Sequence, residues 1–151
     1  MPRKNKNEPF ILNEQLGFHI NRAALLFRRE LIRAFREYNI SPEQWQVLAG
    51  LWQKSPLNQV EIGAITLQEA PTLSRMIEKM SQNGWVRKTR DSEDKRSTLI
   101  ELTPEGDKLR EVLPPKLLSH FAELLRAFPR KKQDQLLRLL QELRTVMGDQ
   151  T

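Results

Sequence analysis

The stretch RDSEDKRSTLIELT, residues 90–103, packs both signs of charge into its first seven positions and then alternates polar and apolar residues. Directly upstream, WVRKTR (residues 85–90) alternates in the same way. Two such runs on either side of a polar connection predict a β-hairpin. A charge run is usually only a solvated loop, so the acids and bases at this tip raise the question of what they do there.

Helix signals precede the hairpin. Ser41 can cap one helix, Asn58 can cap a short second one, and after a turn at 66–69 a further helix over residues 70–84 closes at Gly84. The side chains that we expect to face the core from these helices are Trp45, Leu48, Leu51 or Trp52, Val60, Ile62, Leu73, Met76 or Ile77, and Met80.

Long helices are expected on both flanks. From Leu12 onward apolar residues recur in two adjacent stripes, and because one stripe suffices for a core, we interpret the second as a surface for a partner helix. After the hairpin, Thr103 can cap a long helix that Pro114-Pro115 should kink or break, and a final helix covers 130–148. The first stripe is Leu16, Ile20, Ala24, Phe27, Leu31, Phe35 and Tyr38, the second is Leu12, His19, Ala23 and Leu26, and the last helix presents Leu136, Leu140, Leu143 and Met147.

Length and composition bound the class of protein. The 151 residues suit one domain, and the absence of cysteine excludes disulfides, thiolate zinc sites and thiol redox chemistry in this chain. Residues 1–9 are expected to be a loose tail without the apolar stretch of a signal peptide. No window approaches the roughly 18 apolar residues of a membrane span. We therefore expect a soluble, cytoplasmic protein without a membrane partner.

The net charge of +6 and the pI near 9.9 favour an acidic partner such as nucleic acid. Residues 58–103 nevertheless carry seven basic and seven acidic side chains, so charge alone does not locate a binding face. The order of helix, short helix, turn, helix and hairpin is more informative, because it is typical of a helix-turn-helix with a wing. In such a unit one helix enters a DNA major groove about 12 Å wide.

The helix over residues 70–84 has a polar side that suits this role. Arg75 can read guanine through two hydrogen bonds, while Pro71 and Thr72 offer apolar contacts to a thymine methyl group. Two structural alternatives stay open at this point. Arg75 could pair only with Glu78, and an ion pair between Asp94 and Arg96 could merely hold the hairpin.

The run DKRSTLIELT, residues 94–103, is similar to the wing signature of the MarR/SlyA family, in which Asp-x-Arg is followed by five residues and Leu-Thr. SPEQWQVLAGL (41–51), PTLSRMIEKM (71–80) and NGWVRKTRDSEDKRSTLIELTPEG (83–106) also fit that family in order and spacing. The turn ITLQEAP departs from the Gly-Leu-Ser type turn of many members. It also places Glu69, a weaker cap than Ser or Asp, at the start of the next helix.

The resemblance implies a mainly α fold with a small β-hairpin wing, flanked by dimerisation helices. It divides one domain, residues 1–151, into a DNA-binding lobe at about 40–103 and dimerisation helices at about 10–38 and 104–148. It further implies that Arg96 enters a minor groove and that Asp94 orients it. The candidate DNA-binding residues are Gln68, Pro71, Thr72, Ser74, Arg75, Lys79, Lys95 and Arg96.

Other candidate sites are weaker. His19 and His120 are isolated and have no metal-ligand spacing, so no metal or cofactor is expected, and His19 is expected to pack or hydrogen-bond at a helix contact. Trp45 and Trp52 are interpreted first as core. Because members of the similar family bind small aromatic acids between their two lobes, His19, Trp45 and Trp52 also form a candidate pocket for a small aromatic or phenolic effector. No nucleophile or phosphate-binding loop predicts an enzyme.

The sequence thus predicts a homodimeric transcriptional regulator, a ligand-responsive repressor on a near-palindromic DNA site. Two alternatives remain at this stage. One is a winged-helix module that binds another protein, for which Arg75 and Arg96 would be dispensable. The other is a sequence-indifferent DNA-binding protein, whose affinity would depend steeply on salt and little on sequence.

Overall fold

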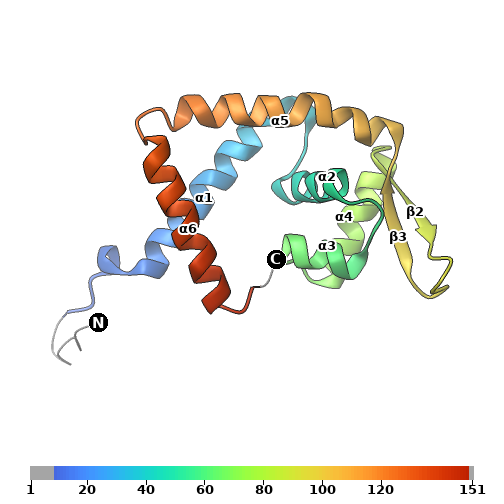
Figure 1. Cartoon of the computed structure of the whole chain (residues 1–151), viewed down its shortest axis with the longest axis horizontal. Helices are drawn as coiled ribbons and strands as arrows, with labels where there is room; N and C mark the ends of the chain where they lie inside the picture. Colours follow the sequence, from blue (N-terminus) through green and yellow to red (C-terminus); the bar gives the residue numbers. More distant parts are fainter. Residues whose placement is uncertain (1–8, 150–151) are drawn as a thin grey trace.

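The computed structural model describes residues 9–149, which fold into helices with one small sheet (Figure 1). This confirms the predicted mainly α class with a β wing. The elements in chain order are η1 (Leu12–Glu14), α1 (Leu16–Ala34), η2 (Arg36–Tyr38), α2 (Pro42–Gln53), β1 (Leu57–Asn58), α3 (Gln59–Thr66), α4 (Ala70–Gln82), β2 (Val86–Arg90), β3 (Thr98–Leu102), α5 (Pro104–Leu124) and α6 (Arg130–Val146).

Helix α5 spans the molecule and links its two regions. Figure 1 shows α5 along the upper edge, with α2, α3, α4 and the sheet below its first half and with α1 and α6 below its second half. The start of α4 and the tip of the wing lie at the lower edge, away from α5.

The predicted caps explain where the helices begin. Ser41 Oγ accepts from the Gln44 amide at 3.1 Å, and Asn58 Oδ1 accepts from the Glu61 amide at 2.9 Å; both form reciprocal capping boxes. Thr103 Oγ1 accepts from the Gly106 amide at 3.1 Å and starts α5. Glu69 precedes α4 without a side-chain cap, as its weak capping ability predicts.

The sheet has three strands where the sequence predicted a two-stranded hairpin. β2 and β3 pair antiparallel from Val86 opposite Leu102 to Arg90 opposite Thr98, and β1 adds a third strand on the other side of β3. β1 escaped prediction because two residues cannot display a period of two.

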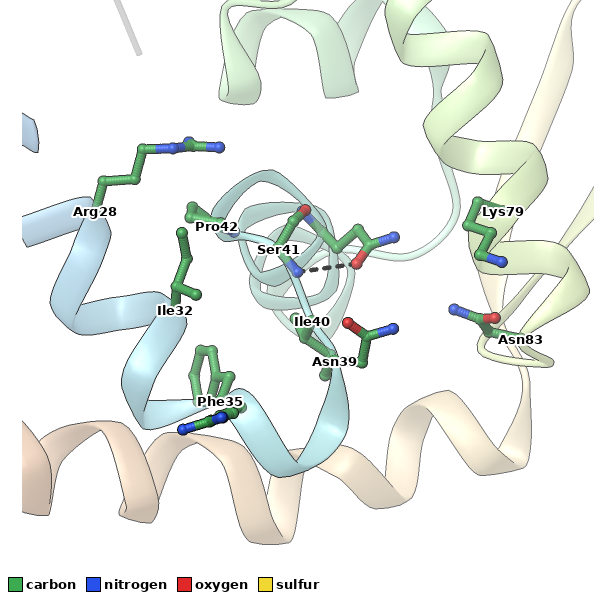
Figure 2. A pocket seen from close by; sticks show the side chains of 11 residues that line it. Arg28, Ile32, Phe35, Asn39, Ile40, Ser41, Pro42, Lys79 and Asn83 are labelled. Carbon is green, nitrogen blue, oxygen red and sulfur yellow. Dashed lines mark hydrogen bonds between the residues drawn. The ribbon is translucent and has the colours of Figure 1, made fainter.

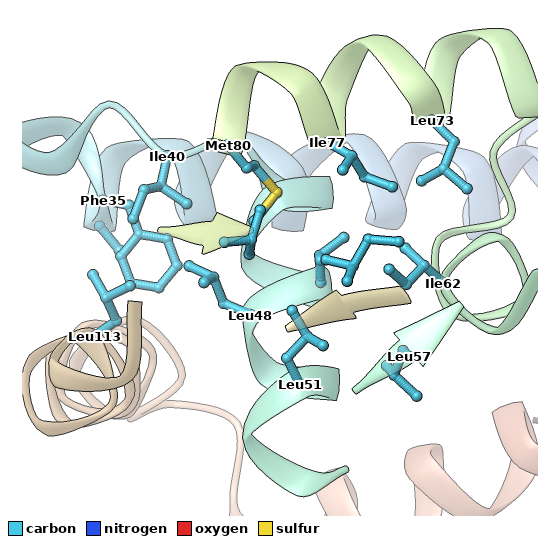
Figure 3. Packing of buried hydrophobic residues seen from close by; sticks show 14 residues of the cluster. Phe35, Ile40, Leu48, Leu51, Leu57, Ile62, Leu73, Ile77, Met80 and Leu113 are labelled. Atoms are coloured by element: carbon cyan, nitrogen blue, oxygen red, sulfur yellow. The ribbon is translucent and has the colours of Figure 1, made fainter. Parts of the chain in front are cut away.

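The core lies between α2, α3, α4 and the sheet, and Phe35 and Leu113 extend it to α1 and α5 (Figure 3). Most residues that we expected to face inward are buried or half-buried there. Val60 is the exception, with 82% of its surface exposed. Because successive helical residues are rotated by about 100°, Val60 points about 200° away from buried Ile62. The short helix is so rich in apolar residues that its periodicity does not tell which of the two faces the core.

Helix α5 does not break at Pro114-Pro115. It continues from Pro104 to Leu124 because buried Leu113 and half-buried Leu117, on either side of the prolines, pack against the core. Tertiary packing here outweighs the local cost of two prolines.

Helix α1 packs against the core only through its C-terminal half. Glu30, Ala34 and Phe35 are buried, whereas Leu16 and Phe27 of the predicted core stripe are exposed by 64% and 47%. Neither stripe therefore finds a complete partner within one chain.

Candidate nucleic-acid interface

Helix α4 has one buried face and one exposed polar face. Leu73, Ile77 and Met80 are almost completely buried, which fixes the rotation of the helix about its own axis. The opposite face exposes Pro71, Thr72, Ser74, Arg75, Glu78 and Lys79, as the helical period predicted. The side chains proposed to read DNA therefore come from a helix that is anchored by its other side.

Helix α3 supports this face through a contact that the sequence did not reveal. Gln59 Nε2 donates to Ser74 Oγ at 3.2 Å, joining the first turn of α3 to the exposed side of α4. The two residues are 15 positions apart, so no local periodicity links them. One of the candidate DNA-binding residues thus already has a protein partner.

Arg75 does not adopt the pairing that the structural alternative required. Its Nε donates to the Pro71 carbonyl oxygen at 3.4 Å within α4. Glu78 instead accepts a hydrogen bond of 2.5 Å from Lys88 Nζ on β2, and this bond lowers the pKa of Glu78. Glu78 therefore links the helix to the wing, and Arg75 remains exposed.

Acidic side chains shape the wing tip through its backbone. Asp91 Oδ1 accepts from the Glu93 amide at 2.9 Å, and Asp94 Oδ1 accepts from the Arg96 amide at 3.0 Å. These short-range bonds are typical of Asx turns. The structure thus differs from the expected ion pair, because Asp94 holds the backbone of Arg96 and not its guanidinium. Lys95 and Arg96 are exposed.

Ion pairs neutralise some of the basic side chains of this lobe and leave others unpaired. Arg87 pairs with Glu101 across the sheet at 2.7 Å, Lys88 with Glu78, and Lys54 with Glu61 at 2.6 Å. Within residues 9–149, five other basic residues between 58 and 103 form no ion pair, and these are Arg75, Lys79, Arg90, Lys95 and Arg96. The balanced net charge of the lobe therefore hides a set of unpaired cations on α4 and the wing.

Gln68 precedes α4 and is half-buried. Its Oε1 atom is buried and has no hydrogen-bond partner among the described residues. The amide oxygen therefore points into the protein, and a role for Gln68 in DNA binding stays a prediction.

A close junction fixes the wing and α4 to α5. Thr103 Oγ1 donates to the Gly84 carbonyl oxygen at 2.5 Å, and Trp52 Nε1 donates to the Gly106 carbonyl oxygen at 3.2 Å. A Cβ atom added to Gly106 would lie 2.0 Å from the Trp85 carbonyl oxygen. Only glycine fits there, so the start of α5 packs directly against the residue that precedes β2.

The candidate pocket of His19, Trp45 and Trp52 is not assembled. Trp45 and Trp52 contact each other with ring centroids 5.7 Å apart and pack against the core, which confirms their first interpretation. His19 lies at the start of α1, where its Nε2 is 2.7 Å from the Asn13 carbonyl oxygen. The three residues fail to meet because α1 carries His19 away from α2 (Figure 1).

A different cavity, of about 430 Å³, lies between α1, the α1–α2 connection and the end of α4 (Figure 2). Figure 2 shows Arg28 and Ile32 of α1 on one side, and Lys79 of α4 and Asn83, which follows α4, on the other. Arg28 also donates to Glu43 through both of its terminal nitrogens, and this hydrogen bond lowers the pKa of Glu43. The lining residues are Arg28, Ile32, Phe35, Arg36, Asn39, Ile40, Ser41, Pro42, Gln44, Lys79 and Asn83.

His120, the second histidine, belongs to a polar contact between α1 and α5. Its Nε2 is 3.2 Å from Oε2 of buried Glu30, which also accepts from Arg33 at 2.6 Å. Burial raises the pKa of Glu30, but the interactions with His120 and the arginines together lower it by more, so the pKa lies below its ordinary value. No group of three or more potential metal ligands occurs among the described residues.

The flanking helices expose their apolar side chains. Of the twenty large exposed hydrophobic residues within the described part of the chain, eighteen fall between 10 and 32 or between 112 and 147, and no residue of α6 is buried. None of the helices within residues 9–149 is long and apolar enough to cross a membrane. The exposed apolar side chains therefore lie on helices that also carry polar residues.

Comparisons with known proteins agree with this geometry. Residues 40–98 match the MarR family. The chain is 36% identical over 117 residues to the HTH-type transcriptional regulator YwoH of Bacillus subtilis, covering 78% of this chain and 85% of that protein.

Solved structures show the same fold. Overoxidized AbfR bound to DNA is 27% identical with a TM-score of 0.71, covering 89% of this chain and 94% of AbfR. BpsR of Bordetella bronchiseptica, whose DNA binding is regulated by 6-hydroxynicotinic acid, is 20% identical with a TM-score of 0.82, covering 90% and 97%. The chain belongs to the MarR family of helix-turn-helix transcriptional regulators, which bind DNA and are not enzymes.

Proposed function

We propose that this regulator is a homodimeric, ligand-responsive repressor that binds a near-palindromic operator in the cytoplasm. The observation that carries the dimer is α6, a helix of 17 residues without one buried side chain in the single chain. An amphipathic helix is stable in water when its apolar face is covered. A second copy would cover α6 together with the exposed apolar residues of α1 and the end of α5.

Each chain would place the start of α4 in a major groove. Arg75, exposed and without an acidic partner among residues 9–149, would read guanine, and Pro71, Thr72, Ser74 and Lys79 would complete that contact. In a dimer, two such helices would enter successive major grooves about 34–36 Å apart.

The wing would make a second contact. Arg96 and Lys95 would reach the minor groove or the phosphates, with Asp94 fixing the turn that presents Arg96. Gln68 would contribute by supporting the turn before α4.

The cavity between the lobes would bind the effector. Arg36 and Lys79 line it together with Arg28, whose charge Glu43 partly compensates, and no acidic residue lines it, which favours a small aromatic or phenolic acid. Its volume of about 430 Å³ suits such a molecule. Because Lys79 belongs to α4 and Arg28 belongs to α1, a bound anion would shift the spacing of the two recognition helices and so weaken operator binding.

The test is selection of bound duplexes from a random DNA pool, followed by titration of the selected duplex with Arg75→Ala. We expect a two-fold symmetric consensus and a loss of about 1–3 kcal/mol per half-site for Arg75→Ala, confined to fixed base positions. Arg110→Ala is the matched control, because Arg110 is an exposed arginine of α5, a helix that lies away from the start of α4 and from the wing tip (Figure 1). It should bind like the wild type.

Two results would overturn the proposal. Binding that fades with salt and selects no sequence would indicate a sequence-indifferent DNA-binding protein. Equal affinity of the Arg75→Ala, Arg96→Ala and wild-type proteins would favour a winged-helix module that binds another protein.

A further inference from the structure

The turn between α3 and α4 contains a leucine in an unfavourable conformation. Leu67 has φ 53° and ψ 29°, in the left-handed region, and ends α3 by donating its amide to the Gly63 carbonyl oxygen at 2.8 Å. Glycine is the usual residue there, because a Cβ atom crowds the backbone. The other non-glycine residue with positive φ among those described is Asn39, of a type that tolerates this region.

The side chain of Leu67 is also exposed, by 79%. The neighbouring residue Gln68 is polar, and yet its amide oxygen is buried without a hydrogen-bond partner among the described residues. The turn thus places an apolar side chain in solvent and a polar atom inside the protein. Both choices oppose folding, and such local conflicts concentrate at functional sites.

The position of the turn indicates what Leu67 serves. Leu67 lies three residues before Ala70, the first residue of α4, and α4 begins at the edge of the lobe that also carries the wing tip (Figure 1). Exposed Thr72 and Arg75 continue this surface into the first turns of α4. The leucine therefore borders the surface that enters the major groove in the proposed function.

We propose that Leu67 contacts the methyl group of a thymine at the edge of the operator half-site, and so adds to sequence specificity. This inference rests on the proposed DNA-binding mode. The thymine methyl is the apolar group that the major groove exposes, and an exposed leucine can bury itself against it. The gain on binding would offset the cost of holding leucine in the left-handed region.

Three substitutions separate the contact from the fold. Leu67→Gly removes both the strain and the side chain, and Leu67→Asn keeps a side chain of similar size that tolerates positive φ but is polar. Leu67→Met, the conservative variant, keeps an apolar side chain. Each variant is titrated with the selected wild-type duplex, and its thermal midpoint is measured in the same buffer. A second set of duplexes carries deoxyuridine, which lacks the methyl group, in place of one thymine of one half-site at a time.

We expect Leu67→Gly and Leu67→Asn to unfold at or above the wild-type temperature and yet to bind at least about fivefold more weakly. Leu67→Met should stay within about twofold. Deoxyuridine at one position should weaken the wild type about fourfold, the loss of one buried methyl group, and should not weaken Leu67→Gly further.

If Leu67→Gly and Leu67→Asn bind as tightly as the wild type, or if deoxyuridine has no effect at any position, the inference is wrong while the proposed function stands. If the wild type selects no duplex at all, the proposed function fails and this inference fails with it.

Discussion

The winged lobe (residues 40–103) and the flanking helices differ in where they put their apolar side chains. Among residues 9–149, eleven of the fourteen buried hydrophobic residues lie in the winged lobe, whereas eighteen of the twenty large exposed ones lie in the flanking segments. The lobe closes a core within one chain, with Ala34, Phe35 and Leu113 as its connections to α1 and α5. The same chain therefore contains one region that closes its own core and one that leaves apolar side chains exposed.

The two regions also differ in what their polar groups do. In the lobe, capping boxes and ion pairs satisfy local charges and leave Arg75, Lys95 and Arg96 exposed. Between the regions, Arg28 of α1 pairs with Glu43 of α2, whereas Glu30 and His120 join α1 to α5 within the flanking helices. Polar contacts thus set how the lobe is held, while apolar surface would set how two chains meet.

The largest effect is expected from a charge placed on the flanking surface. Leu136→Glu, on the exposed apolar face of α6, should leave a folded monomer, because a carboxylate cannot be buried against a second copy without a partner. Losing the linkage of two half-sites should weaken operator binding roughly 10²- to 10⁴-fold. Sedimentation and DNA titration measure both. Gln135→Glu adds the same charge beside it and should remain dimeric; a dimeric Leu136→Glu protein would remove α6 from the interface.

A smaller effect is expected at the junction of the two regions. Gly106→Ala places a Cβ atom against the Trp85 carbonyl, so it should destabilise the protein by about 1–3 kcal/mol in urea unfolding. Gly17→Ala is the control, since a Cβ atom there meets nothing within 4 Å and alanine favours the helix. Equal stability of the two variants would show that α5 is not fixed to the wing at this point.

The smallest effect concerns pH and the ion pair that joins α1 to α2. The pKa of Glu43 lies below its usual value because Arg28 donates to the carboxylate. The folded state therefore binds a proton at Glu43 less readily than the unfolded state does. The stabilisation should be complete above the ordinary glutamate pKa of about 4.3 and lost as the pH falls through the folded pKa. Glu43→Gln should therefore be less stable than the wild type at pH 7, and the difference should shrink toward pH 3.

Because both side chains are partly exposed, the difference at pH 7 should stay below about 1 kcal/mol. Urea unfolding across the pH range measures it. In an Arg28→Gln background the effect of Glu43→Gln should vanish; a difference that persists there, or that is constant with pH, would attribute it to something other than this pair.

Local chemistry made most of the lobe predictable. Ser41, Asn58 and Thr103 marked helix starts, and alternation marked β2 and β3. Leu73, Met80 and either Met76 or Ile77 marked the buried face of α4, and the structure buries Ile77. Each of these signals acts within a few residues, so the sequence displays it directly. The exposed side of α4 followed, and with it the candidate DNA-binding face.

Features that depend on distant residues were not predictable. The strand β1, the uninterrupted α5 and the bond from Gln59 to Ser74 arise from tertiary packing. The cavity unites Arg28 with Asn83, which no spacing connects. His19 contacts Asn13, while Trp45 and Trp52 contact each other, and no spacing displays this either. The chain's own periodicity could only suggest that α1 and α6 need a partner.

The most direct test that the winged lobe recognises DNA while the flanking helices pair two chains is the number of chains in the complex with DNA. Sedimentation of the selected duplex with increasing protein should show two chains bound per duplex in one cooperative step, and a duplex carrying a single half-site should bind at least about 100-fold more weakly. One chain per duplex, with equal affinity for the half-site, would contradict the account, because the flanking helices would then have no part in DNA recognition.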